Sequence, residues 1–137
     1  MTNKNWTTKD IPDQKGKITI VTGANTGLGK EISRQLAKKN AIVIMAVRNM
    51  KKGKQAAEEI LHEVPKATIV VMKLDLSSLK SVQTFSENYK KKYSKLNCLI
   101  NNAGVMACPF SKTKDGFEIQ MGVNHLGHFA LTGHLMP

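Results

Sequence analysis

The residues best suited to chemistry in this sequence form one glycine-rich string, T-G-A-N-T-G-L-G at positions 22–29. It follows the apolar run 18–21 and precedes a segment with helical apolar spacing, which predicts a strand, a turn and a helix. Gly23 permits a sharp turn, and Gly27 and Gly29 let a ligand approach the backbone closely. Bare N–H groups and the helix dipole would then suit a pyrophosphate. A turn of this kind without a ligand is the alternative interpretation.

A second signal follows the apolar run 41–47, roughly 20 residues beyond the glycines. An acid at this place would accept a hydrogen bond from a ribose 2′-hydroxyl, whereas an arginine would bind a 2′-phosphate. The sequence has Val47 and Arg48 there and no acid in the expected position. Arg48 offers a bidentate, charge-assisted contact to phosphate, which favours NADP over NAD. An exposed arginine after a strand is the alternative.

The elements that must position these residues alternate strand and helix along the chain. We expect strands at about 17–22, 41–47, 68–74 and 96–101, and helices at about 28–39, 50–63, 77–93 and 117–136. Right-handed crossovers would place the four strands in the order 3-2-1-4, as an α/β, Rossmann-like, doubly wound parallel sheet. Ligands bind such sheets at the carboxyl ends of the strands, where the strand order reverses. The polar motifs all fall at those ends.

Length and composition predict one modest domain. The polar lead-in 1–16 lacks the apolar core of a signal peptide, and the domain is expected to occupy 17–137. The sequence contains no run of about 18 apolar residues, so a membrane span is not expected. Cys98 and Cys108 make a poor disulfide framework, and Cys98 is expected to be buried in its strand. A reducing, cytoplasmic location fits best.

The net charge of +11 comes from lysines that gather at 51–54 and 90–95. A nucleic acid or an anionic surface would explain such clusters. We favour solvated helix faces instead, because only Tyr89 and Tyr93 accompany the second cluster and few aromatic rings are available to stack on bases. No nucleic-acid partner is therefore expected.

Three histidines near the end of the chain invite a metal-site interpretation. His125 and His128 are neighbours on a helix, but His134 falls on the face opposite His125 at about 100° per residue. No acidic residue completes a ligand shell. The sequence therefore predicts no metal site.

Four motifs in this order resemble the short-chain dehydrogenase/reductase family, in particular its retinol-dehydrogenase-like members and related bacterial oxidoreductases. They are 22–29, Asp75-Leu76, the N-N-A-G string 101–104 and the V-N-H-L-G string 123–127. The resemblance runs from about residue 6 to residue 137. It implies an oxidoreductase that transfers a hydride between NADP(H) and a small alcohol or carbonyl substrate, and a homo-oligomer at full length.

The resemblance assigns a role to each matching residue. The residues implied to bind the cofactor are Gly23, Asn25, Thr26, Gly27, Leu28, Gly29, Arg48, Asp75, Leu76, Asn102, Ala103 and Gly104. Thr26 stands where some NADP-preferring members carry a basic residue, so the preference depends mainly on Arg48. Asp75 would meet the adenine amino group, although an acid flanking a helix is the alternative. Asn124 would be the catalytic asparagine that positions a water in a proton relay.

One departure from the family limits these expectations. The family's catalytic serine and its Tyr-x-x-x-Lys pair lie downstream of the asparagine helix, and no tyrosine follows Tyr93 in this sequence. Carbonyl reduction needs a proton donor near the site. The resemblance therefore implies an incomplete NADP-binding domain, truncated before the later strands, inactive by itself and inclined to associate. A non-catalytic nucleotide-binding or interaction module that ends naturally at Pro137 is the alternative.

Overall fold

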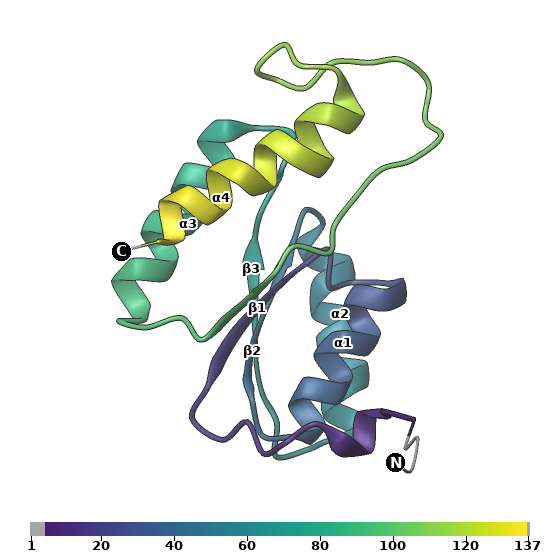
Figure 1. The fold of residues 1–137 in the computed structure, drawn as a ribbon, viewed down its shortest axis with the longest axis vertical. Helices are drawn as coiled ribbons and strands as arrows, with labels where there is room; N and C mark the ends of the chain where they lie inside the picture. The colour runs from purple at the N-terminus through teal and green to yellow at the C-terminus, as the bar shows by residue number, and fades with distance from the viewer. Residues whose placement is uncertain (1–4, 137) are drawn as a thin grey trace.

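Four parallel strands form the sheet at the centre of the structure (Figure 1). The computed structural model describes residues 5–136. The sheet order is β3-β2-β1-β4, which confirms the predicted order 3-2-1-4. The strands are β1 (Ile18–Thr22), β2 (Ile42–Val47), β3 (Thr68–Lys73) and β4 (Cys98–Ile100).

Helices cover both faces of this sheet (Figure 1). On one face lie α1 (Gly27–Lys38) and α2 (Met50–Glu63), and on the other lie α3 (Leu79–Lys92) and a helix made of η2 (Met121–Gly127) and α4 (His128–Leu135). This is the doubly wound α/β arrangement that alternating strands and helices predict. Each right-handed crossover returns the chain to the same edge of the sheet, so the four strands end on one side.

Strand β2 has both of its faces buried, as its unbroken apolar run predicts. Val43 and Met45 pack toward α1 and α2, whereas Ile44 and Ala46 pack in the cluster on the α3 side. These four side chains are at most 1% exposed. The sheet therefore rests on two separate apolar layers, one on each face.

Two helix starts are held by side-chain caps. The side chain of Asn49 accepts a hydrogen bond from the N–H of Lys52 and begins α2. Ser78 does the same for the N–H of Ser81 and begins α3. Such caps satisfy N–H groups that the first helical turn leaves without a partner. They place the end of each preceding strand directly beside a helix start.

The last helix differs from its prediction. We expected a continuous helix over 117–136, but residues 112–118 form a turn in which the N–H of Thr113 donates to the carbonyl of Phe117. The helix begins after this turn, and η2 within it is π-helical. A π-helical segment accommodates an extra residue and often marks a functional site. Sequence periodicity near 3.6 does not reveal such a segment.

The fourth strand is shorter than predicted, and the expectation that Cys98 is buried is wrong. Cys98 begins β4 at the edge of the described sheet, where it pairs with Thr19 of β1, and it is exposed. Just before β4, the side chain of Asn97 accepts a hydrogen bond from the N–H of Ile18, and the N–H of Asn97 donates to the carbonyl of Ile18. Both Cys98 and Cys108 are free.

The lead-in packs against the corner between α1 and β2. The N–H of Gln14 donates to the carbonyl of Lys39 at 2.7 Å, and the amide of Asn40 donates to Asp13 at 2.9 Å. The residues before position 5 lie outside the described range. Among the helices of residues 5–136, none combines the length and the apolarity needed to cross a membrane.

A glycine inside α2 provides a test of how tightly the helix packs on the sheet. A β-carbon at Gly53 would lie 2.5 Å from Val47 Cγ2 and 2.9 Å from Val71 Cγ1. Both valines are stiff at χ1, so we expect Gly53→Ala to lower the free energy of unfolding by about 1–3 kcal/mol. Gly133→Ala in α4 is the matched control. It meets no atom within 4 Å, so this change should stabilise by up to about 1 kcal/mol.

Urea unfolding of the natural polypeptide that carries this chain measures both variants. Equal midpoints for Gly53→Ala and Gly133→Ala would contradict the close packing of α2 on β2 and β3.

Candidate dinucleotide-binding site

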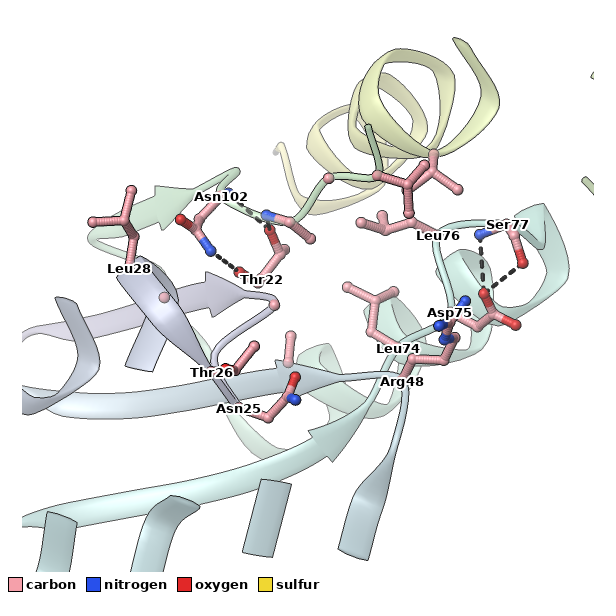
Figure 2. Close-up of a pocket in the computed structure, with 17 residues that line it drawn as sticks. Thr22, Asn25, Thr26, Leu28, Arg48, Leu74, Asp75, Leu76, Ser77 and Asn102 are labelled. Atoms are coloured by element: carbon pink, nitrogen blue, oxygen red, sulfur yellow. Dashed lines mark hydrogen bonds between the residues drawn. The ribbon is translucent and has the colours of Figure 1, made fainter. Parts of the chain in front are cut away.

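A pocket of about 470 Å³ opens at the carboxyl ends of the four strands (Figure 2). Every residue predicted to bind the cofactor lines it except Gly27. The structure therefore brings together motifs that are spread over positions 22 to 123 of the sequence. The complete lining consists of Thr22, Gly23, Asn25, Thr26, Leu28, Gly29, Ala46, Arg48, Leu74, Asp75, Leu76, Ser77, Asn102, Ala103, Gly104, Val105 and Val123.

The glycine-rich turn joins β1 to α1 in a conformation that requires glycine. Gly23 has φ +65° and Gly27 has φ +53°, both in the left-handed region. A β-carbon at Gly29 would collide with the carbonyl oxygen of Gly23 and lie 2.5 Å from the side-chain amide of Asn102. At Gly27 nothing lies within 4 Å of that position. The turn is closely packed against the loop after β4 at Gly29, whereas the space beside Gly27 is open.

The first turn of α1 faces the pocket without a side-chain cap. Thr26 is the N-cap residue, and its side chain makes no capping hydrogen bond. The N–H groups that open a helix have no carbonyl partner within the helix, and they carry the positive end of its dipole. Together with the open space beside Gly27, this arrangement suits an anion such as a pyrophosphate.

Thr22 ties the glycine-rich turn to the loop that follows β4. Its hydroxyl accepts hydrogen bonds from the N–H groups of Asn102 and Ala103, each at 2.9 Å. The side-chain amide of Asn102 donates in turn to the carbonyl of Thr22 at 2.9 Å (Figure 2). Thr22 is fully buried, so these bonds lie away from water. Thr22 thus holds together the glycine-rich turn and the loop after β4, which form two walls of the pocket at this end.

Arg48 and Asp75 line the part of the pocket formed by the ends of β2 and β3. Arg48 is exposed directly after β2, and its carbonyl accepts a hydrogen bond from the side chain of Lys73. The guanidinium is therefore carried on a backbone held to the neighbouring strand. Its position leaves the charge at the rim, where a phosphate could reach it.

The carboxylate of Asp75 is organised by its own loop. Burial raises its pKa, but hydrogen bonds from the hydroxyl and the N–H of Ser77, at 2.6 and 3.0 Å, together with Lys114, outweigh burial, so the pKa lies below its usual value. Hydrogen bonding to the charged form favours ionisation. Asp75 is a fixed acceptor at the rim of the pocket.

Asn124, in η2, does not line this pocket, but its side chain contacts Val105, which does. Its side-chain oxygen accepts from the N–H of Val105, and its side-chain amide donates to the carbonyl of Val105, both at 2.8 Å. These two bonds clamp the loop after Gly104 to the last helix. Asn124 also lines a shallow groove with His128 and Phe129. A catalytic contact of its side chain would compete with the clamp.

Several lining residues were not predicted. Thr22, Ala46, Leu74, Ser77, Val105 and Val123 all flank predicted residues in the sequence. Thr22, for example, directly precedes Gly23. Adjacency to a predicted residue was the one feature of the sequence that could have indicated these positions. The buried contact between His128 and Thr22 had no signal, because the two residues are 106 positions apart. Among residues 5–136, no group of acidic, histidine or cysteine side chains forms a metal site.

Comparison with known proteins assigns the chain to a family. The model of the short chain dehydrogenase family matches residues 17–137. The chain belongs to this family, and with it to a class of oxidoreductases with a Rossmann-like fold.

Relatives and solved structures agree with this assignment. The chain is 54% identical over 117 residues to retinol dehydrogenase 12 of Mus musculus, covering 85% of this chain and 37% of that protein. A crystal structure of an uncharacterized protein from Mycobacterium paratuberculosis superposes with a TM-score of 0.86 and 45% identity, covering 96% of this chain and 46% of the other. A short chain dehydrogenase from Shigella flexneri, solved in complex with NADP, superposes with a TM-score of 0.76 and 29% sequence identity. The match covers 93% of this chain and 55% of the other.

The clamp made by Asn124 can be tested by changing one atom of its side chain. Asn124→Asp keeps the acceptor for the N–H of Val105 but points a carboxylate oxygen at the carbonyl of Val105. We expect a loss of about 1–3 kcal/mol in the free energy of unfolding, because a donor is lost and two acceptors face each other.

Asn88→Asp on α3 is the matched control, since Asn88 is exposed. Urea unfolding of the natural polypeptide compares the two variants. A loss for Asn124→Asp no larger than for Asn88→Asp would show that the clamp contributes nothing to stability.

Proposed function

We propose that the protein carrying this chain is an NADP(H)-dependent oxidoreductase acting on an alcohol or carbonyl substrate. The observation that carries the cofactor choice is Arg48, which stands at the rim of the pocket where an NAD-binding site needs an acid. Family membership and a structural neighbour solved with NADP support the same choice. Family membership does not favour the alternative of a non-catalytic module.

The residues around the glycine-rich turn fit the phosphates of such a cofactor. Gly23, Gly27 and Gly29 would border the pyrophosphate, with Asn25, Thr26 and Leu28 beside it at the start of α1. The bound NADP(H) would supply or accept the hydride. The protein's own contribution here is a row of N–H groups presented without a competing side-chain cap.

The remaining assignments follow the two ends of the pocket. Arg48 would pair with the 2′-phosphate, and Asp75 and Leu76 would contact the adenine. The loop 102–104 would border a ribose, held in place by the hydroxyl of Thr22. An ionised, hydrogen-bonded Asp75 is suited to accept from an exocyclic amino group. These roles are predictions for this chain.

We propose a positioning role for Asn124 in the reaction. Its side chain makes two hydrogen bonds to Val105, so its part would be to hold the loop and to present its backbone rather than to transfer a proton through its amide. The family's serine and Tyr-x-x-x-Lys pair, absent from this sequence, would supply the proton chemistry.

The proposed substrate class comes from membership of the family. The chain spans 37% of retinol dehydrogenase 12, and the residues that line its pocket would contact the cofactor. We propose a small alcohol–carbonyl pair as the substrate class. The predicted homo-oligomer, the cytoplasmic location and the absence of a nucleic-acid partner stay predictions.

The role of Arg48 predicts a change in cofactor preference. Arg48→Ala in the natural polypeptide should weaken NADPH binding about 10- to 100-fold and leave NADH binding nearly unchanged, because a charge-assisted pair contributes roughly 1.5–3 kcal/mol. Fluorescence titration with both cofactors measures this. Lys54→Ala on α2 is the control, since it removes the same charge from an exposed residue outside the pocket. Unchanged NADPH affinity in Arg48→Ala would refute the assignment.

A further prediction concerns the 137-residue polypeptide itself. We expect no carbonyl reduction by it, since the carbonyl oxygen that gains a proton when the hydride is added has no positioned proton donor without the tyrosine and lysine of the family pattern. The assay combines the purified polypeptide with NADPH and a panel of aldehydes and ketones. Turnover that follows the protein through purification and disappears in Asn124→Ala would overturn this expectation.

A further inference from the structure

His128 is a buried histidine in contact with the residue that organises the pocket. It is 6% exposed, and its Nε2 lies 2.9 Å from the hydroxyl oxygen of Thr22. Its other ring nitrogen, Nδ1, lies 3.1 Å from the backbone carbonyl of Asn124. The ring therefore connects the end of β1 to the π-helical segment that contains Asn124.

The hydrogen-bonding capacity of Thr22 determines the direction of this contact. A threonine hydroxyl has two acceptor lone pairs and one proton to donate. The N–H groups of Asn102 and Ala103 occupy both lone pairs, each at 2.9 Å. The proton is left for either the carbonyl of Ile100 at 3.4 Å or Nε2 of His128 at 2.9 Å. The shorter contact is the better hydrogen bond.

The second ring nitrogen agrees with this direction. When Nε2 accepts the proton of Thr22, a neutral imidazole carries its own proton on Nδ1. Nδ1 faces the carbonyl of Asn124, which only accepts. The ring is mostly surrounded by protein, and burial lowers the pKa of His128 despite the hydrogen bond to Asn124, which raises it. A neutral ring satisfies every polar atom of the network.

We propose that His128 is held as the neutral Nδ1–H tautomer and serves as a positioning residue for the cofactor site. By accepting the proton of Thr22, it turns the threonine lone pairs toward Asn102 and Ala103 and so holds the loop after β4. Through Nδ1–H it ties the same hydroxyl to the backbone of Asn124. The tautomer follows from these hydrogen bonds whether or not a cofactor binds, whereas the positioning role rests on the proposed function.

The tautomer can be measured directly by long-range ¹⁵N–¹H correlation spectra of the natural polypeptide, with His128→Gln to assign the signals. We expect one protonated nitrogen, assigned to Nδ1, and one unprotonated nitrogen, assigned to Nε2. The Nε2–H tautomer or a charged ring at neutral pH would overturn the proposal. This experiment needs no cofactor, so it remains decisive even if NADP(H) does not bind.

The positioning role is tested by variants that keep or remove the acceptor. Gln at position 128 can place its carbonyl oxygen near the position of Nε2, whereas Leu cannot accept. We expect His128→Leu to weaken NADP(H) binding roughly 2- to 10-fold, and His128→Gln to recover much of it. His134→Gln, an exposed histidine on α4, is the control and should bind like the wild type. Equal losses in the Leu and Gln variants would contradict the role.

A double-mutant cycle with Thr22→Val separates this role from general packing. If His128 acts through the hydroxyl, replacing it by Leu in the Thr22→Val background should add little further loss of NADP(H) affinity. Fully additive losses would overturn the positioning role. Absence of NADP(H) binding by the wild type, together with the Nδ1–H signature, would instead refute the proposed function and leave the tautomer standing.

Discussion

The hydroxyl group of Thr22 is the point at which three parts of the structure meet. It lies at the end of β1, receives the N–H groups of Asn102 and Ala103 from the loop after β4, and contacts His128 of the last helix. Without this hydroxyl the N–H of Ala103 would lose its partner at a cost of about 1–3 kcal/mol, whereas the N–H of Asn102 also reaches the carbonyl of Ile100 at 3.0 Å. This oxygen acts together with the pairing of β1 and β4 and with the bond from the Asn102 amide to the carbonyl of Thr22, and these contacts set the spacing of the two walls.

The parallel sheet explains why such a connection is possible at all. Every crossover returns the chain so that β1, β2, β3 and β4 end on the same side. The residues that follow the strands are therefore gathered without any direct attraction between them. Arg48 and Asp75 are an example, since they line one pocket but come from loops after different strands. Short-range hydrogen bonds, such as those from Ser77 to Asp75, then fix each group in place.

The last helix, made of η2 and α4, is tied to the pocket at the ends of the strands. Its π-helical segment presents Asn124, whose side chain is engaged with Val105. An asparagine with both polar atoms bonded to one backbone unit acts as a spacer of fixed length. The backbone around Asn124 is then tied to the pocket twice, once through Val105 and once through His128. A displacement of the helix would therefore also displace the loop after β4.

Local patterns in the sequence were enough to predict the order of the strands and the glycine-rich turn, and the family resemblance implied most of the residues that line the pocket. These features depend on short-range chemistry: β-branched runs form strands, glycines permit positive φ, and parallel strands bring their ends together. The start of the last helix and the exposure of Cys98 were predicted wrongly. The turn over 112–118 closes on itself and is also bonded to Ser77 and Leu79 at the start of α3, and the short β4 pairs with β1 at the edge of the described sheet.

Only the tertiary structure decided what the side chains at the centre of the site contact. No spacing in the sequence relates His128 to Thr22, 106 residues earlier, or indicates that the amide of Asn124 is used by Val105. The reason is physical: a hydrogen bond is satisfied by whichever partner the folded chain brings within about 3 Å, and that partner is set by the packing of the helix on the sheet rather than by its neighbours in the sequence.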